Sequence, residues 1–126
     1  MEQLQTKRIR FSKETDTWLR VMKSRTDITP NLLCRLGFCL SLEEPGVPDN
    51  SKHPEDSERE INRYTLLGDY ELVLVSLLRQ RLQSDGIPLT QLDEQFRAHM
   101  HRGVVLLAGR VKELTDLAEI VGHPRT

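Results

Sequence analysis

The chain has 126 residues, of which 37% are hydrophobic and 29% are charged, and its formal net charge at pH 7 is −1. This length fits one domain spanning 1–126, and a chain this lean in apolar residues often completes its core by oligomerisation. The sequence lacks the run of about 20 apolar residues that a membrane span requires, and its first residues lack the order of a signal peptide. We therefore expect a cytoplasmic protein that does not contact a membrane.

Charge is distributed unevenly along the chain. Residues 1–42 carry eight Lys or Arg against four Asp or Glu, which gives +4, whereas residues 43–60 carry two against seven, which gives −5. Residues 61–126 are balanced at eight of each sign. A segregated basic end is the feature to which a phosphate backbone responds, so the near-zero net charge does not exclude a nucleic-acid partner.

The basic end begins with a predicted strand. Residues 6–11 alternate, with Ile9 and Phe11 on one side and Arg8 and Arg10 on the other. Alternation with period two is typical of a half-buried strand. The sequence therefore predicts a short strand with one apolar and one basic face.

Two helices are predicted after this strand. Ser12 is a favourable N-cap for a helix over 13–25, whose apolar residues recur at helical spacing. Thr29 followed by Pro30 is a second start signal, for a helix that reaches about Leu42. Residues 1–42 thus form a predicted strand-helix-helix unit.

An acidic segment, residues 43–60, separates this unit from the rest of the chain. It contains three prolines and almost no apolar residue, so we expect an exposed, mobile linker. Residues 61–126 are then predicted to be helical.

The first long helix of this last part is predicted from about Asp69 to Ser84, with apolar residues around much of its circumference. Such a helix should be the most buried one. Another helix is predicted over 91–121, with a possible break at Gly103. Apolar residues recur along it at spacings of three and four, as in an a/d seam: Val104, Leu107, Val111, Leu114, Ala118 and Val121. This seam fits packing inside the monomer or against a symmetry mate.

The expected fold class is therefore mainly α, with a short N-terminal strand, a helix bundle and a ribbon-helix-helix-like N-terminal unit in an oligomer. In that arrangement two strands pair antiparallel across a dimer, and the resulting ribbon fits the major groove of B-DNA. The start of the second helix would offer N–H groups to a phosphate. The candidate DNA-binding residues are Lys7, Arg8, Arg10, Lys13, Arg20, Lys23, Arg25, Thr29 and Asn31. The same residues also fit ordinary solvated charges on an edge strand and a helix.

Other reactive side chains give weaker signals. Cys34 and Cys39 are interpreted as small buried apolar residues. His99 and His101 lie two apart and cannot share a helix face, so a surface or interface role is favoured over a metal site. Without a phosphate loop or a nucleophile-base order, we expect no catalytic residue, no metal, no cofactor and no enzyme activity.

Arg59, Arg63 and Tyr64 form an unusual stretch after the acidic segment. They fit contacts with a sugar-phosphate backbone or a partner protein, and local ion pairing of the two arginines fits equally well.

Four runs of the sequence resemble the family of the DNA sulfur modification protein DndE. They are residues 4–12, 28–35, 59–68 and 99–103. The resemblance implies a non-catalytic subunit of the bacterial system that replaces a non-bridging phosphate oxygen of DNA by sulfur. It also implies a tetramer that acts with the other subunits of the modification complex and favours nicked duplex DNA. The basic positions that match are Lys7, Arg8, Arg10, Lys13, Lys23 and Arg25.

Two other hypotheses compete with this one. A ribbon-helix-helix repressor would use Arg8 or Arg10 to read guanine edges in a specific operator. An enzyme that nicks DNA or transfers sulfur would need a nucleophile or a metal site that the sequence does not show.

Overall fold

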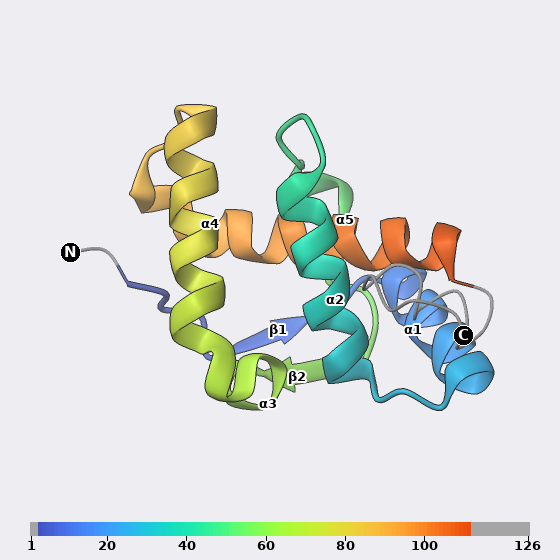
Figure 1. The fold of residues 1–126 in the computed structure, drawn as a ribbon. Helices are drawn as coiled ribbons and strands as arrows, with labels where there is room; N and C mark the ends of the chain where they lie inside the picture. The colour runs from blue at the N-terminus through green and yellow to red at the C-terminus, as the bar shows by residue number, and fades with distance from the viewer. Residues whose placement is uncertain (1–2, 112–126) are drawn as a thin grey trace, which may run out of the picture.

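The secondary structure is mainly helical, as expected from the sequence. The computed structural model describes residues 3–111. Its elements in chain order are β1 (Arg8–Arg10), α1 (Lys13–Thr26), α2 (Pro30–Glu43), the 3-10 turn η1 (Asn50–Lys52), β2 (Glu60–Asn62), α3 (Arg63–Leu67), η2 (Gly68–Tyr70), α4 (Glu71–Asp85), η3 (Leu89–Gln91) and α5 (Leu92–Arg110). In Figure 1, α2 and α4 stand as two upright helices, α5 crosses both, and the two strands lie below.

The strand β1 finds its partner within the same chain. It pairs antiparallel with β2, so that Ile9 lies opposite Ile61 and Arg10 opposite Glu60. The ladder continues beyond the strands, because the Phe11 N–H donates to the Arg59 carbonyl at 3.0 Å. This intramolecular ribbon replaces the ribbon expected across a dimer. The sequence did not suggest β2, because three alternating residues at the end of an acidic linker are too weak a pattern.

Of the two predicted N-cap residues, Ser12 makes a capping hydrogen bond and Thr29 does not. The Ser12 hydroxyl accepts a hydrogen bond from the Thr15 N–H at 3.1 Å and so caps α1. Helix α1 ends at Asp27, whose φ of 59° is left-handed. Thr29 occupies the N-cap position of α2, but its side chain makes no capping hydrogen bond.

The acidic segment is exposed along most of its length, yet the rest of the fold holds it at several points. Pro48 and Ser57 are buried. The Arg97 guanidinium donates to the Asn50 side chain at 2.8 Å and to the His53 carbonyl at 2.6 Å. It also donates to the Arg10 carbonyl, at 2.9 Å from Nη2. One side chain of α5 thus connects η1 with β1.

Two further arginines hold the start of this segment and the C-terminus of α2. Arg102 donates to the Ser41 carbonyl at 2.7 Å and to the Gly46 carbonyl at 2.8 Å. Arg81 donates to the Leu42 carbonyl at 2.8 Å and to the Gly46 carbonyl at 2.6 Å. The last carbonyl groups of a helix have no partner within the helix, and cations there also oppose its dipole. Arg81 and Arg102 therefore stabilise the end of α2.

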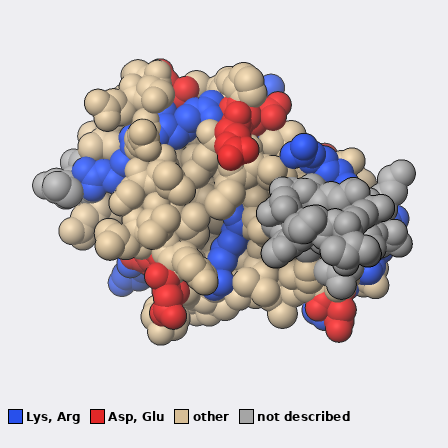
Figure 2. Space-filling view, in the orientation of Figure 1, with Lys and Arg blue, Asp and Glu red and all other residues tan. Residues whose placement is uncertain are grey.

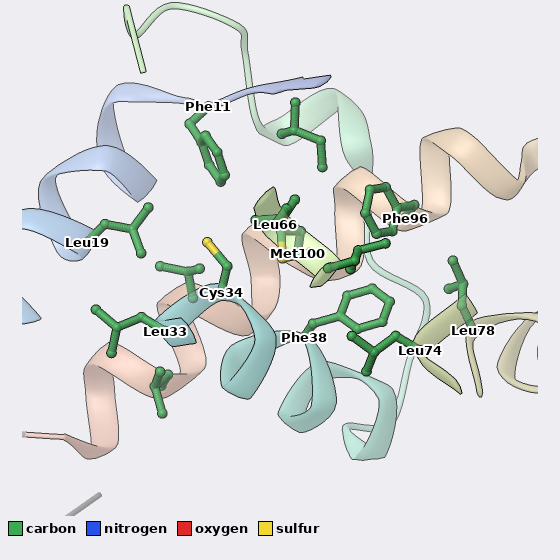
Figure 3. Packing of buried hydrophobic residues seen from close by; sticks show 14 of the residues in the cluster. Phe11, Leu19, Leu33, Cys34, Phe38, Leu66, Leu74, Leu78, Phe96 and Met100 are labelled. Carbon is green, nitrogen blue, oxygen red and sulfur yellow. The ribbon is translucent and has the colours of Figure 1, made fainter. Parts of the chain in front are cut away.

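The hydrophobic core lies between α1, α2, α5 and the buried face of the ribbon. Figure 3 shows Phe11, Phe38 and Phe96 among the aliphatic side chains that fill it. Phe38 and Phe96 meet edge to face, with 5.6 Å between their ring centroids. Packing of this kind joins α2 to α5, which form the most extensive helix pair in the fold.

The expectation that the helix from Asp69 to Ser84 is the most buried one is wrong. Helix α4 buries one stripe, at Leu74, Leu78 and Leu82, whereas Leu72 is 80% exposed and Val73 is 57% exposed. Much of α4 is exposed because the helix lies at the edge of the fold and packs through one face only. The most buried helix is α5, which the other elements surround.

Helix α5 is continuous through Gly103, so the break suggested there does not exist. Gly103 instead lets α5 approach α2 closely. Along the seam, Val104, Leu107 and Val111 are fully buried within the chain, so this part of the seam packs inside the monomer. The other seam residues, Leu114, Ala118 and Val121, lie outside the described residues. Among the helices described, none combines the length and the apolar character needed to cross a membrane.

Candidate nucleic-acid interface

The ribbon presents basic side chains on its outer face. Ile9 and Phe11 are buried while Arg8 and Arg10 are exposed, as the alternating pattern predicts. Lys7, which precedes β1, is exposed as well. The Arg10 Nε donates to the Ser57 carbonyl at 2.9 Å. Within residues 3–111, Lys7 makes no ion pair, so its ammonium group is available to a ligand.

The basic residues of α1 are all exposed. Lys13 and Arg20 line one cleft together with Thr17, Ser57 and three carboxylates, those of Asp16, Asp56 and Glu58. Because Arg10 also reaches Ser57, the structure brings Arg10, Lys13 and Arg20 together around this residue.

The remaining basic residues of α1 lie further along the helix. Lys23 is 3.9 Å from the exposed carboxylate of Asp27, which is a weak contact. Arg25 makes no ion pair within the described part of the chain. Lys23 lies three positions after Arg20 and continues its side of α1, whereas Arg25, two positions after Lys23, projects from a different side.

Asp16 fixes the position of α1 against the chain that leads into β2. Its buried carboxylate accepts hydrogen bonds from Arg59 and, at 2.8 Å, from the Ser57 hydroxyl, and it pairs with Arg20 at 3.1 Å. Burial acts to raise the pKa of Asp16, but the hydrogen bonds from Arg59 and Ser57 outweigh it and hold this pKa below its usual value. Arg20 thus has one anionic partner already.

The start of α2 is not part of this group. Thr29 is exposed, but the Asn31 side chain donates to the Thr65 carbonyl of α3 at 3.4 Å. Asn31 therefore serves the packing of α2 against α3.

Arg59 and Arg63 bind other parts of the chain, whereas Tyr64 lies on the surface. Arg59 is held by Asp16, and Arg63 donates to the Leu4 carbonyl at 2.6 Å and pairs with Glu71 at 3.2 Å. Both arginines are thus used inside the fold, but their partners lie outside this stretch of the sequence and are not the neighbouring Glu60 that local ion pairing would have used. Tyr64 is 79% exposed and free for other contacts.

The two histidines of α5 are fully buried, which corrects the expected surface or interface role. His101 Nε2 accepts the Ser12 N–H at 3.1 Å, and its Nδ1 lies 3.0 Å from the Arg97 carbonyl, to which it donates. His101 is therefore a neutral ring that joins α5 to the start of α1. Burial lowers its pKa to about 3.

His99 is held in a similar way at the end of α2. The Ser41 hydroxyl accepts from Arg102 Nε at 2.9 Å and is hydrogen-bonded to His99 Nδ1 at 2.8 Å. Burial lowers the pKa of His99 to about 4. Both rings are structural, and no local pattern indicated this because their partners lie far away along the chain.

The cysteines divide between core and surface. Cys34 is buried as expected, whereas Cys39 is exposed, which corrects the expectation of two buried thiols. Across residues 3–111 no group of three or more His, Cys, Asp or Glu side chains has the arrangement of a metal site.

On the side of α2 and α4 the basic residues do not form a continuous patch. Figure 2 shows that Lys and Arg are scattered among acidic and uncharged residues on the side of α2 and α4. The cations on this side are thus dispersed and do not form a patch.

Comparison with known proteins relates this fold to DNA modification. The crystal structure of DndE from Escherichia coli B7A, involved in DNA phosphorothioation modification, has a TM-score of 0.67 and 25% identity, and the match covers 86% of this chain and 100% of that one. A DndE mutant involved in DNA phosphorothioation, with two glycines replaced by lysines, has a TM-score of 0.64 and 23% identity over 83% of this chain and 99% of that one. No curated protein matches the chain.

The chain thus has the small, mainly helical fold of a protein class involved in DNA sulphur modification. The model of the family described as DNA sulphur modification protein DndE matches residues 8–115, which is most of the chain. The chain therefore belongs to the DndE family.

Proposed function

We propose that this protein is a non-catalytic DNA-binding accessory subunit of DNA phosphorothioation. It binds duplex DNA, and nicked duplex most strongly, through the basic side chains of β1 and α1. The observation that carries the proposal is the gathering of Arg10, Lys13 and Arg20 around Ser57, with Arg8 exposed on the same strand. Family membership supplies the biological context.

The chemistry of these side chains suits a phosphate backbone. Guanidinium groups form charge-assisted hydrogen bonds with phosphate oxygens, and an ammonium group adds a point charge. Contacts of this kind position a protein on DNA without reading its sequence. A repressor that reads an operator has less support, because the expected ribbon of two β1 strands is replaced by pairing of β1 with β2.

A non-catalytic role is supported by the burial of three reactive side chains, although the Cys39 thiol is exposed. His99, His101 and Cys34 are fully buried, so none of them can touch a DNA strand on the surface. In this proposal the sulfur chemistry belongs to the other subunits of the modification complex, which this protein holds at the DNA.

The proposed assembly is a homotetramer. The exposed apolar side chains of α4 support an interface, because a helix that is apolar all around is normally covered. An unpaired strand no longer supports oligomerisation, because β1 pairs with β2 within the chain.

Fluorescence anisotropy of one labelled duplex, in intact, nicked and single-stranded form, tests the proposal at two salt concentrations. We expect binding that is strongest for the nicked duplex, weakens steeply with salt and is unaffected by shuffling the sequence. Removing one cation that binds a phosphate should reduce the slope of log K against log salt by about 0.9.

Two variants and a control make this test specific. Arg10→Ala and Lys13→Ala should weaken binding, whereas Lys52→Ala, an exposed cation on η1, should not. Absence of binding to all three DNAs, or equal binding at both salt concentrations, would contradict the proposal.

A further inference from the structure

An acidic stretch of the chain lies directly beside the basic residues of the ribbon and α1. In the register of the ribbon, Glu60 is opposite Arg10, and its carboxylate is 3.5 Å from Arg8. Beyond the ribbon the same relationship recurs, because the Asp56 carboxylate accepts the backbone N–H of Lys13 at 2.8 Å. The acidic stretch therefore follows the basic one in antiparallel order.

A third carboxylate completes this arrangement. Glu58 lines the same cleft as Lys13 and Arg20. We call Asp56, Glu58 and Glu60 the acidic strip; all three residues are exposed. The strip thus places carboxylates where the phosphates of a bound DNA strand would have to lie.

We propose that the acidic strip competes with DNA phosphates for the basic side chains of β1 and α1, and so limits the affinity of the protein for duplex DNA. The inference rests on the proposed function and adds a regulation of the same surface. A carboxylate and a phosphate both accept hydrogen bonds from Arg and Lys, and they cannot occupy one position together.

The contacts of the strip are of the kind that a ligand can displace. The Arg8–Glu60 pair is exposed and therefore weak, so its cation can exchange one anion for another. The N–H of Lys13 belongs to the first turn of α1, where a helix favours an anion, and Asp56 takes this position in the free protein. DNA binding must move these carboxylates aside or accept their repulsion.

The test uses a variant that removes the charge of the strip and keeps its oxygen acceptors, Asp56→Asn with Glu58→Gln and Glu60→Gln. We expect it to bind the intact duplex about tenfold more tightly than wild type at low salt, with a steeper loss of affinity as salt is added. The slope should be steeper because cations that no longer pair with internal carboxylates can neutralise additional phosphates. Each phosphate neutralised releases counterions from the DNA.

A second triple variant controls for total charge. Glu43→Gln, Asp69→Asn and Glu94→Gln change the net charge equally, and these exposed residues lie on α2, η2 and α5. The inference requires that this variant bind the duplex as wild type does. An equal gain in both variants would overturn it, since total charge and not the strip would then set the affinity.

The remaining outcomes separate this inference from the proposed function. Binding by wild type with no gain in the strip variant overturns the inference alone. Absence of binding by both proteins overturns the proposed function and the inference with it. Urea unfolding of each variant establishes that the proteins compared are folded.

Discussion

Gly37 of α2 and Gly103 of α5 lie backbone against backbone. A Cβ atom added to Gly37 would be 2.6 Å from the carbonyl carbon of Gly103, and one added to Gly103 would approach the Gly37 carbonyl oxygen more closely still. Real Cβ atoms do not come this near to a backbone. The extensive packing of α2 against α5 therefore depends on the absence of a side chain at both positions.

Substitution of either glycine by alanine should destabilise the protein. Overpacking of a filled core costs about 1–3 kcal/mol, and occasionally more, and here the obstacle is rigid backbone. We expect Gly103→Ala to reach about 3 kcal/mol in urea unfolding. Gly109→Ala is the matched control, because the same helix leaves open space there, and it should be neutral or stabilising by up to about 1 kcal/mol. Equal stabilities of the two variants would contradict the close crossing.

The buried histidines make stability dependent on pH. The folded pKa values of His101 and His99 are about 3 and about 4, below the value of about 6.5 expected in the unfolded chain. Between these values the unfolded state binds more protons, so the free energy of unfolding should fall as the pH drops from about 6.5 to about 4. Urea titrations at several pH values measure this slope.

The variant His101→Gln should flatten the slope. The amide of Gln can accept a hydrogen bond as His101 does from Ser12, and it does not titrate. An unchanged slope in this variant would mean that other groups cause the acid sensitivity.

The two thiols should differ in reactivity. Cys34 is completely buried, and burial raises its pKa to about 12. Cys39 is exposed, although partial desolvation and then Glu43 raise its pKa as well. We expect an aromatic disulfide reagent to modify one thiol in the native protein and two in urea. The variant Cys39→Ser should show none before unfolding, and rapid reaction of Cys34 would argue against the observed packing.

The apolar face of α4 should determine the native mass if it is a subunit interface. Replacing Leu72 by Gln and Val73 by Thr removes apolar surface without touching the buried stripe of α4. We expect light scattering after gel filtration to give a lower mass for this variant than for wild type. The control is Val47→Gln, an exposed apolar residue outside α4, which should leave the mass unchanged. A monomeric wild type would contradict the tetramer.

Local signals in the sequence predicted the first part of the fold well. The alternation around Ile9, the cap at Ser12 and the pair Thr29-Pro30 all act within a few residues. Helices α1 and α2 begin where these signals place them, and β1 lies within the alternating residues 6–11. The pairing of β1 could not be predicted in the same way. Its partner is a three-residue strand that is stable only because β1 lies beside it.

The same division holds for the candidate site. Exposure of Arg8, Arg10 and Lys13 followed from the patterns of strand and helix, and the structure agrees. The roles of Asn31 and His101 did not follow, because their partners, the Thr65 carbonyl and the Ser12 N–H, are distant in the chain. The burial of α4 was also predicted wrongly. Apolar residues around a helix do not tell which of its faces the neighbouring helices cover.

The hydrogen bonds of Arg97 also constrain the order in which the chain can fold. This side chain is required at the Arg10 carbonyl and at the loop residues Asn50 and His53, and it is added late in synthesis. The N-terminal strand can therefore make these contacts only once the first turns of α5, which begins at Leu92, have been made. Contacts between the two ends of a chain close large loops and slow folding. The first 42 residues, which look like a self-contained unit in the sequence, therefore complete their contacts only with β2 and the last described helix.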